Sequence, residues 1–460
     1  MTESRKKTLV LGGGIAGLTA ANALRMRGAE TLLVEKSPRV GGAIRTFERD
    51  GFLAEGGPQT FVAEDKKLFD FLRATDVLPA AIDAFPAAKK RFIVRGGKPR
   101  AVPASVVSAA TTPLFSFFGK MRLLAEPFVP ARRDGSAESV ADFVRRRIGR
   151  EMYDYALNPL VAGIFAGDPE KLDVRFAFPK VWNLEQRYGS LIRGTLPNAK
   201  AKRASGLYEK KRTLSFPHGM ETLPKMLRAR LDPRGVRVDS ELTEIAREGG
   251  GWRARRRSRA AVCTFFEEDE FFDALLIAIP PRAWKEIPFR DEALREFFAR
   301  IEPPPTPPVT MLTLGFPRER VEHALDGFGM LVPEKERRKI LGTLFTSSLF
   351  PNRAPRGFVT LSTYLGGTRQ PEIARLPADA QLEIVREELR ALLGAEGEPA
   401  FVERVENPCA IPQYDIGCEK FFAALDEAEK AFPLRFAGNF RGGISVAQTM
   451  LSALNAAEKI

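Results

Sequence analysis

The hydrophobic and polar positions near the N-terminus follow a strand, helix, strand order. Thr8–Leu11 and Thr31–Val34 are short apolar runs that predict buried strands, and Ile15–Arg27 repeats its apolar positions with a helical period. Gly28 follows, at the position where glycine commonly ends a helix. The first strand and the helix are joined by a Gly-x-Gly-x-x-Gly turn, Gly12 to Gly17. The pattern therefore predicts a β-α-β unit that binds a dinucleotide.

The glycines and the acidic residue of this unit suit a dinucleotide. Gly12 permits the tight turn, Gly14 lets the backbone approach a pyrophosphate, and Gly17 lets helix and strand pack closely. The N-terminus of the helix presents free N–H groups to the phosphates. Glu35 is placed to accept a hydrogen bond from a ribose hydroxyl, which disfavours a 2′-phosphate and leaves NAD or FAD.

Later apolar patterns predict a second, antiparallel region. Lys89–Arg100 predicts a basic hairpin, and Trp252–Phe272 alternates as antiparallel strands whose arginines form a solvated face. Phe272–Ile279 predicts a buried strand that returns to the dinucleotide domain. Four further runs predict one antiparallel sheet, the wall of a substrate chamber: Val309–Phe316, Gly327–Val332, Lys339–Phe345 and Phe358–Leu365.

Helical and irregular segments separate these strands. Glu138–Arg150 predicts a helix capped by Ser136, and Ala378–Leu393 predicts a clear amphipathic helix. The first of these helices has a basic face made of Arg145, Arg146, Arg147 and Arg150. Lys200–Arg212 is basic and poor in apolar residues, so we expect a surface connection there.

The stretch between Arg100 and Lys120 carries no charge. Pro103, Pro113 and several hydroxyl side chains make it a poor transmembrane helix. An apolar wedge with a cationic rim favours contact with one face of a membrane, and the alternative is a helical lid on the substrate domain. The wedge comprises Leu114, Phe115, Phe117 and Phe118, and the rim Lys120 and Arg122.

Composition narrows the possible functions. At 460 residues the chain is long enough for two or three domains. With 71 Lys and Arg against 58 Asp and Glu, the net charge is +13 and favours anionic partners such as acidic lipid or carboxylate-rich substrates. No basic motif interleaved with aromatic residues is present, so nucleic acid is the weakest of these partners.

Histidine and cysteine usage excludes several kinds of site. His218 and His323 are the only histidines, so we expect neither a histidine-built metal site nor a Ser-His-Asp triad. Cys263, Cys409 and Cys418 form no CxxC pair and indicate reduced thiols in a cytoplasmic chain. The residues before the first strand are too few and too polar for a signal or transit peptide.

Two further glycine-rich turns follow the first β-α-β unit. Arg39-Val40-Gly41-Gly42 suggests a loop that folds back over the same dinucleotide, and Glu55-Gly56-Gly57-Pro58 is a turn with a carboxylate. Taken with the first turn and Glu35, they resemble the N-terminal signature of FAD-dependent oxidases and desaturases such as monoamine oxidase and phytoene desaturase. A last glycine-rich turn, Gly438–Val446, precedes a helix that extends to Ala457, and such a turn commonly closes over the flavin ring.

Inner motifs over nearly the whole chain resemble one branch of these enzymes, the oxygen-dependent protoporphyrinogen oxidases. These motifs are Lys90-Arg91-Phe92, Gly163 to Pro169, Gly327 to Pro333, Leu341 to Phe345, Phe350 to Pro355, Tyr364 to Gly367, Pro412-Gln413-Tyr414 and Ala437 to Val446. The resemblance implies an α/β fold, α+β overall. It combines a Rossmann-like FAD-binding domain that is discontinuous in sequence, a substrate domain with an antiparallel sheet, and a helical insertion that contacts a membrane.

The resemblance also implies domain boundaries and site residues. The FAD-binding domain comprises 1–87, 235–290 and 420–460, the substrate domain 88–105, 197–234 and 291–419, and the helical domain 106–196. The FAD-binding residues are Gly12, Gly13, Gly14, Ile15, Ala16, Gly17, Glu35, Lys36, Arg39, Gly41, Gly42, Gly57, Pro58, Val238, Gly438, Asn439, Ile444, Ser445 and Val446. The substrate-binding residues are Arg91, which pairs with a propionate, Gly167, which leaves room for the macrocycle edge, and Phe328, Leu331, Leu344 and Tyr364, which sandwich the rings.

The implied activity is the six-electron oxidation of protoporphyrinogen IX to protoporphyrin IX in heme biosynthesis, with O₂ reduced to H₂O₂ through FAD. No side chain is assigned as a catalytic acid or base, and no metal is expected. The protein is expected in the cytoplasm, peripheral on an anionic inner membrane face, with a ferrochelatase as a partner. Three alternatives stay open: the same chemistry on coproporphyrinogen III, an amine oxidase, and a flavin-bearing scaffold that hands porphyrin to a ferrochelatase.

Overall fold

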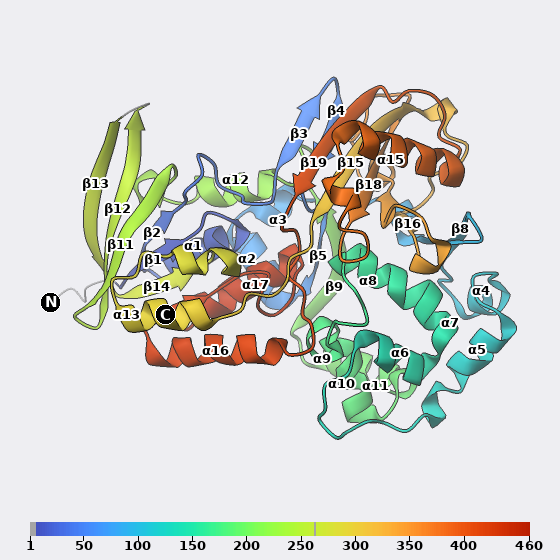
Figure 1. Cartoon of the computed structure of the whole chain (residues 1–460), viewed down its shortest axis with the longest axis horizontal. Helices are drawn as coiled ribbons and strands as arrows, with labels where there is room; N and C mark the ends of the chain where they lie inside the picture. The colour runs from blue at the N-terminus through green and yellow to red at the C-terminus, as the bar shows by residue number, and fades with distance from the viewer. Residues whose placement is uncertain (1–5, 262–263) are drawn as a thin grey trace.

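The computed structural model describes residues 6–261 and 264–460, and two β-sheets with a helical region organise it (Figure 1). The first sheet is parallel, and its five strands lie in the order β10-β2-β1-β14-β20. These are β1 (Lys7–Leu11), β2 (Glu30–Val34), β10 (Val236–Arg237), β14 (Ala274–Ile277) and β20 (Leu434–Phe436). Segments from both ends and the middle of the chain therefore build one sheet, and the predicted return of the buried strand to the dinucleotide domain is confirmed.

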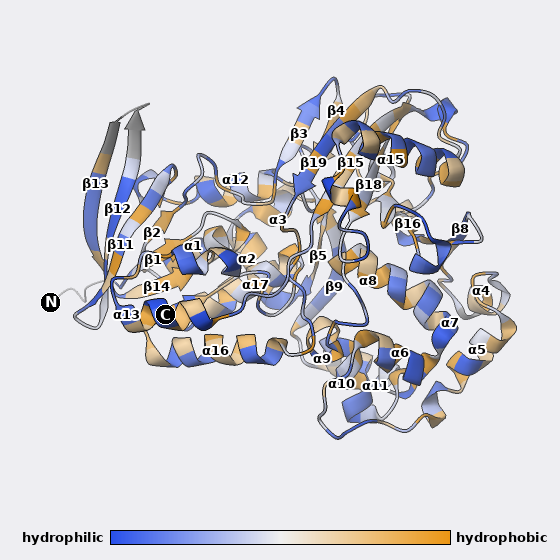
Figure 2. Cartoon of the chain, viewed as in Figure 1, coloured by the Kyte–Doolittle hydropathy of each residue, from blue (hydrophilic) through white to orange (hydrophobic). Residues whose placement is uncertain are grey.

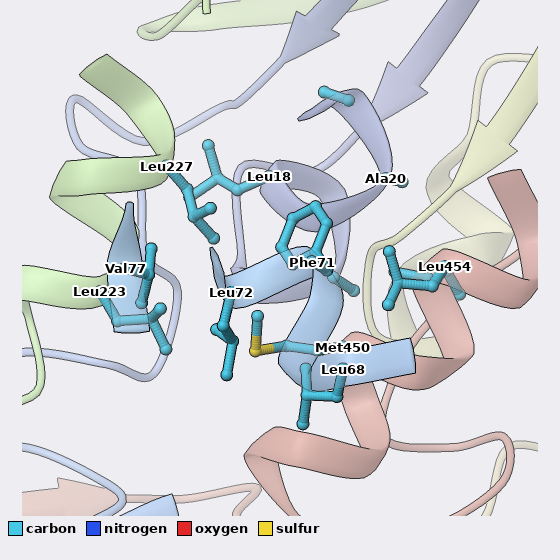
Figure 3. Close-up of a cluster of buried hydrophobic side chains, with 14 of the residues drawn as sticks. Leu18, Ala20, Leu68, Phe71, Leu72, Val77, Leu223, Leu227, Met450 and Leu454 are labelled. Atoms are coloured by element: carbon cyan, nitrogen blue, oxygen red, sulfur yellow. The ribbon is translucent and has the colours of Figure 1, made fainter. Parts of the chain in front are cut away.

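Helices cover one face of this sheet. The predicted first helix is confirmed as α1 (Ile15–Met26), with Arg27 as C-cap and Gly28 at φ +85° directly after it. Leucine, phenylalanine and methionine side chains from four neighbouring helices pack together with α1 (Figure 3). Those helices are α2 (Lys66–Ala74), α3 (Val77–Ala80), α12 (Thr222–Ala229) and α17 (Val446–Ala457).

The opposite face is covered by a three-stranded antiparallel sheet and two helices, packed around buried Trp252, Trp284 and Phe298. The elements are β11 (Ser240–Glu248), β12 (Gly251–Ala261), β13 (Thr264–Phe272), α13 (Glu292–Arg300) and α16 (Cys418–Ala431). The hydrophilic colour of β12 in Figure 2 reflects its arginines, which pair with acidic residues of β11 and β13. Arg256 is an exception to the predicted solvated face, because it is buried against Glu268 and Glu270. Cys263 lies outside the described residues.

The second large sheet has seven strands in the order β19-β15-β18-β17-β16-β7-β8. They are β7 (Phe92–Arg95), β8 (Lys98–Ala101), β15 (Val309–Pro317), β16 (Gly329–Leu331), β17 (Gly342–Leu344), β18 (Phe358–Gly366) and β19 (Phe401–Asn407). α15 (Ala378–Leu393) packs on one face over the buried side chains of Leu312, Met330 and Leu361. The antiparallel pairing predicted for β15, β16, β17 and β18 is confirmed. The sheet as a whole is mixed, because β7 comes from a distant part of the chain and pairs parallel with β16.

Short strands join the two large sheets. β3 (Thr46–Arg49) and β4 (Phe52–Glu55) form a hairpin, while β5 (Phe61–Asp65) and β6 (Ile82–Asp83) both pair with β9 (Tyr208–Ser215). The surface connection expected over Lys200–Arg212 is wrong, because its first residues extend a helix and its last residues belong to β9. Two charged side chains of β9 have ion-pair partners, Arg73 for Glu209 and Asp83 for Arg212, which offset its low hydrophobicity.

The helical region lies at the outer edge of the molecule, below the seven-stranded sheet in Figure 1. Its helices are α4 (Val106–Thr111), α5 (Phe117–Leu124), α6 (Val140–Ile148), α7 (Arg150–Met152), a π-helical turn (Tyr153–Leu157), α8 (Asn158–Phe165), α9 (Val174–Ala177), α10 (Pro179–Tyr188) and α11 (Leu191–Ala204). Within the described ranges, no helix is both long and apolar enough to span a bilayer.

The structure corrects two expectations for the predicted 138–150 helix. Its N-cap is Ser139, whose hydroxyl accepts a hydrogen bond from the Asp142 N–H, while Ser136 bonds to Asp134 in the preceding loop. Its basic face is not free either, because three of the four arginines have carboxylate partners. Arg145 pairs with Glu170, Arg146 with Glu138 and Glu185, and fully buried Arg147 with Glu126.

Candidate functional site

The C-terminal ends of the five parallel strands meet at one edge of their sheet. The Gly12 turn follows β1, Glu35 follows β2, Val238 follows β10, and the Ala437–Gly443 turn follows β20. Ligands of open α/β sheets bind at this edge. The structure therefore brings together, at one place, candidate residues from the two ends and the middle of the chain.

The Gly12–Gly17 turn has the shape that a pyrophosphate needs. Gly12 has a φ of +102°, and a Cβ on Gly17 would lie 1.9 Å from the Gly12 carbonyl oxygen, so no larger residue fits there. A Cβ on Gly14 would meet nothing within 4 Å, so space is open above the N-terminus of α1. No side chain caps α1, and its first turn has no acidic residue, which leaves the N–H groups of Ile15, Ala16 and Gly17 to a ligand.

Glu35 lies beside this turn. Its carboxylate accepts hydrogen bonds from the Gly13 N–H (2.7 Å) and from the backbone and hydroxyl of Ser37. Half-buried Val238 follows β10, whose Arg237 carbonyl accepts the Glu35 N–H. Lys36 points to solvent and pairs with Glu241 at 2.9 Å. Glu35 and Val238 thus lie together beside the glycine turn, and their expected contact with a ribose stays a prediction. Lys36 forms its ion pair with Glu241 of β11.

The Arg39–Ile44 loop folds back on the glycine turn, as the sequence suggested. Gly41 forms a bridge to Gly14, and a Cβ on Gly42 would lie 3.3 Å from the Gly14 Cα. The Arg39 guanidinium donates to carbonyls of its own loop, including Gly42 at 2.7 Å. Gly57, which precedes Pro58, packs against this loop, because its Cβ would lie 2.3 Å from the Ala43 oxygen. Arg39 therefore shapes the loop, and its expected contact with pyrophosphate stays a prediction.

The C-terminal turn is tied to the helical region by Tyr414. Its hydroxyl donates to the Asn439 carbonyl (2.8 Å) and accepts from the Gly443 N–H (3.0 Å). Gly438 packs against the Phe440 ring, and Ile444 contacts the core of the helical region. Ser445, the N-cap of α17, and Gln448, in the first turn of the helix, form a capping box, and Val446 is the first residue of α17. A rigid turn thus fixes the N-terminus of a second helix near this edge of the sheet.

These features fit FAD. The open space at Gly14, the uncapped N-terminus of α1 and the Glu35 carboxylate would hold its pyrophosphate and ribose. The turn before α17 presents backbone groups and the positive end of a helix dipole, which suit negative charge on a flavin ring.

A buried ion pair lies beside this edge. Glu55, the last residue of β4, accepts hydrogen bonds from the Thr46 hydroxyl (2.7 Å) and the Met220 N–H (2.9 Å). The guanidinium of Arg353 lies 3.8 Å from the same carboxyl and also donates to Ser215 and Phe216. Burial raises the pKa of Glu55 to about 7, although both hydrogen bonds and the charge of Arg353 oppose this shift. Glu55 therefore lies within reach of a change in protonation near neutral pH.

Three predicted substrate residues share one face of the seven-stranded sheet. Leu331 and Tyr364 both pair with Gly342, and Leu344 lies two residues beyond it, so all three project to the side opposite α15. Small residues let α8 approach this face, since a Cβ on Gly163 would lie 2.5 Å from a Leu331 methyl group. Burial raises the pKa of the Tyr364 hydroxyl, which therefore stays protonated. The side chain of Gln59, which follows Pro58, lies close enough to that hydroxyl to oppose this rise, so the face lies against the Glu55–Pro58 turn, here called the flavin-side turn.

Arg91 and Phe328 form a separate group next to this face. The Arg91 guanidinium lies 5.1 Å from the centre of the Phe328 ring, and the Phe328 N–H donates to the Lys90 carbonyl. Phe328 packs against Ala88, Leu349 and Phe350, and not with the three residues on the sheet face. Arg91 is exposed and has no carboxylate partner among the described residues, in contrast to Lys90, which pairs with Asp326.

Gly167 occupies a position different from the one expected. The sequence suggested that it leaves space for a macrocycle, yet a Cβ there would lie 2.2 Å from Oε1 of buried Gln413. Gln413 donates to the carbonyls of Phe165 and Ile411. The missing side chain of Gly167 thus makes room for Gln413, and a contact with substrate stays a prediction.

Sequence reasoning gave no role to Glu55, Gln59, Arg353 or Gln413. Glu55 and Arg353 lie in motifs that the sequence identified, but their pairing joins distant segments and depends on the folded structure. Two features of the sequence could have drawn attention to them: Glu55 precedes a glycine-rich turn, and Arg353 lies between Pro351 and Pro355.

Known proteins resemble the whole chain. The profile of the family described as Flavin containing amine oxidoreductase matches residues 15–460. Protoporphyrinogen oxidase 2, chloroplastic/mitochondrial, of Arabidopsis thaliana is 32% identical and covers 99% of this chain and 94% of its own. Coproporphyrinogen III oxidase of Bacillus subtilis (strain 168) is 27% identical over 94% of this chain and 93% of its own. The crystal structure of a provisionally assigned protoporphyrinogen oxidase from Exiguobacterium sp. 255-15 superposes with a TM-score of 0.78 at 22% identity, covering 99% and 98% of the two chains.

Proposed function

The chain belongs to the flavin-containing amine oxidoreductase family, and from this membership we propose that it oxidises protoporphyrinogen IX to protoporphyrin IX in heme biosynthesis. The observation that carries the proposal is the apolar face of Leu331, Leu344 and Tyr364, which lies against the flavin-side turn. The rings of a tetrapyrrole are apolar and suit such a face, while its propionates need a cation at the edge. Arg91, exposed and without a carboxylate partner in the described residues, supplies that cation.

The chain contributes binding and orientation, and bound FAD supplies the two-electron oxidation, with O₂ as the final acceptor. Arg91 would hold a propionate in a fork-like contact and fix the macrocycle at one edge. Gln59 donates a hydrogen bond to the Met311 sulfur of β15, which ties the flavin-side turn to the sheet that carries the apolar face. Conversion to the aromatic porphyrin removes six electrons, which requires about three two-electron rounds in one binding site.

Coproporphyrinogen III is the second candidate substrate, and a relative with that activity in its name supports it. This porphyrinogen carries four carboxylates, and Lys89 is a second exposed cation next to Arg91 without an ion-pair partner in the described residues. Full engagement of both cations would favour the substrate with more carboxylates.

The direct test is turnover of both porphyrinogens in air by the purified, flavin-loaded protein. We expect fluorescent porphyrin from both substrates, with a higher kcat/KM for protoporphyrinogen IX. Higher kcat/KM for coproporphyrinogen III would assign the alternative. If neither protoporphyrinogen IX nor coproporphyrinogen III is converted to porphyrin, both proposals are wrong.

We also propose that the protein acts in the cytoplasm, bound peripherally to the inner face of the cell membrane. Two residues of the predicted wedge do not fit it, because Leu114 is fully buried and Phe115 is half-buried. The supporting observation is a group of exposed apolar side chains on and beside α5, which from here on defines the apolar wedge: Phe117 (70% exposed), Phe118 (82%), Met121 (47%), Leu124 (63%) and Phe128 (81%). Soluble surfaces rarely group such side chains, and a protein partner or an apolar membrane interface would cover them. Because protoporphyrin is apolar, release toward a membrane, or to a ferrochelatase docked there, would keep it out of water.

A further inference from the structure

A cavity of about 420 Å³ opens beside the apolar wedge, between α5, α7 and the segment around Lys335. Its lining contains four cations, two acids and two aromatic rings: Arg95, Arg122, Arg150, Lys335, Glu151, Asp154, Phe118 and Tyr155. Phe118 belongs both to this lining and to the apolar wedge. A ligand in the cavity would therefore lie at the level where the wedge enters a membrane interface.

Two of the four cations are neutralised inside the cavity. Arg95 pairs with Glu151 at 2.8 Å and lies over the Tyr155 ring, and Lys335 pairs with Asp154 at 2.8 Å. These pairs use both acids of the lining. They leave the charges of Arg122 and Arg150 without a carboxylate partner among the described residues.

The two remaining cations differ in how they are held. Arg122 donates to the carbonyls of Arg146 (2.6 Å) and Arg147 (3.0 Å) at the end of α6, which fixes its position without neutralising its charge. Arg150 is exposed, and its side chain makes no hydrogen bond or ion pair within the described ranges. Asp154 raises the pKa of Lys335, and the nearby charge of Arg150 opposes that rise. The charges of Arg122 and Arg150 thus stay uncompensated in the lining of the cavity, an arrangement that an anion would relieve.

The arginines of the helix next to the cavity differ from Arg122 and Arg150 in this respect. Every arginine on the neighbouring α6 has a carboxylate: Glu170 for Arg145, Glu138 for Arg146 and Glu126 for Arg147. The cavity is also separate from the proposed propionate contact, because Arg91 and Arg95 stand at opposite ends of β7, roughly 13 Å apart along a strand.

We propose that this cavity binds the phosphate of an anionic phospholipid headgroup, with Arg122 and Arg150 as its ligands. Arginine forms forked, charge-assisted hydrogen bonds with phosphate oxygens. The contiguous apolar wedge selects a membrane lipid over a free ion, because only the lipid phosphate arrives with acyl chains for Phe118 and its neighbours to contact. This inference rests on the membrane contact proposed above.

The test is binding of the full-length, flavin-loaded protein to sedimented vesicles of phosphatidylcholine, with and without phosphatidylglycerol. Arg150→Gln is the informative variant, because Arg150 has no structural contacts to lose. Arg193→Gln is the matched control, since Arg193 lies beside Phe128 on the same side of the molecule but outside the cavity. We expect Arg150→Gln to weaken binding to phosphatidylglycerol vesicles about fivefold or more and Arg193→Gln to weaken it less. Turnover of soluble porphyrinogen should stay unchanged in both variants.

Three outcomes would overturn the headgroup site. Equal losses in the two variants would indicate diffuse attraction, and no loss for Arg150→Gln would remove the site. Saturable stabilisation by inorganic phosphate alone at millimolar concentration would assign the cavity to a free anion. The double variant Phe117→Ser, Leu124→Ser tests the membrane contact separately from the headgroup site, because it changes two residues of the apolar wedge that do not line the cavity. If this double variant binds all vesicles as the unmodified chain does, the membrane contact itself fails.

Discussion

At the scale of single residues, the Glu55–Arg353 pair joins the β3–β4 hairpin to the loop between α14 and β18. Both side chains are almost fully buried, and each is satisfied by further hydrogen bonds. The sequence identified both motifs but not their contact, because proximity of distant segments is a property of the fold. Arg91 was more accessible to prediction, since a cation that opens an apolar strand already stands out in the chain.

Glu55→Gln should change how stability depends on pH. The pKa of Glu55 is raised from 4.5 to about 7, so between these values the folded protein holds a proton that the unfolded chain has lost. The contribution of Glu55 to the free energy of unfolding is thus complete below pH 4.5. It declines by about 3 kcal/mol in total as the pH rises to 7, and then levels off. Glutamine cannot titrate; its single carbonyl oxygen can still accept from the Met220 N–H, and its amide nitrogen can donate to the Thr46 hydroxyl in place of accepting from it.

The measurement is the free energy of unfolding of both proteins from pH 4.5 to 8, plotted as a difference. We expect the advantage of the unmodified chain over the variant to shrink with rising pH across this window. The neighbouring Arg353 and Glu221 are common to both proteins, so their contribution largely cancels. A constant difference would contradict the raised pKa.

Arg91→Ala should act on substrate binding. Loss of a charged contact to a propionate costs about 1.5–3 kcal/mol, which is roughly a 10- to 150-fold rise in KM with kcat changed little. Lys98→Ala, an exposed cation on the same hairpin, is the control and should leave KM unchanged. Steady-state kinetics with both porphyrinogens measure the effect. An unchanged KM for Arg91→Ala would instead favour a scaffold that carries porphyrin without anchoring it through this residue.

At the scale of elements, the β1–α1 unit was the most predictable part of the site, because its glycine spacing and hydrophobic period lie within one short segment. The role of each glycine was less predictable. The structure separates Gly17, which is required for packing of the turn, from Gly14, which borders open space.

Gly14→Ala tests whether that space is used by the cofactor. The backbone of Gly14, at φ −69°, suits alanine, and the added methyl group meets nothing within 4 Å, so the fold should persist. The methyl group would obstruct the pyrophosphate, so the purified variant should lose most of its yellow colour. Gly28→Ala is the control, with a cost of roughly 1 kcal/mol at a positive φ and full flavin content. The ratio of flavin to protein absorbance measures the bound flavin in each variant. A normal flavin content in Gly14→Ala would contradict the assignment of the space at Gly14 to the pyrophosphate.

The helical region depends on a buried network that its sequence did not disclose. Helical spacing identified the arginines of α6 as one face, but it could not show that α10 and Glu126 enclose that face. Arg147→Met should therefore lower the free energy of unfolding by about 3–5 kcal/mol, because Glu126 is left buried and unpaired.

Arg145→Met on the same helix is the matched control. Its pair with Glu170 is exposed, so the loss should be under about 1 kcal/mol. Urea unfolding of the two variants measures the difference. Equal stabilities would show that the buried pair contributes no more than the exposed one.

At the scale of the whole molecule, local patterns predicted most strands and long helices, but not how they are shared between sheets. The parallel pairing of β7 with β16 and the use of Lys200–Arg212 in α11 and β9 both arise from contacts between distant segments. The clearest success is the return of β14 to the first sheet, since a continuous apolar run indicates a buried parallel strand. The proposed domain boundaries stay predictions.

The central claim is that one site, with flavin at the edge of the parallel sheet and a porphyrinogen on the Leu331, Leu344 and Tyr364 face, carries out the whole oxidation. The most direct measurement follows porphyrin fluorescence and O₂ uptake together when the yellow, purified protein receives protoporphyrinogen IX in air. The account predicts porphyrin formation with about three O₂ consumed for each porphyrin, as six electrons require. A flavin-loaded protein that forms no porphyrin above the rate of spontaneous oxidation would contradict it.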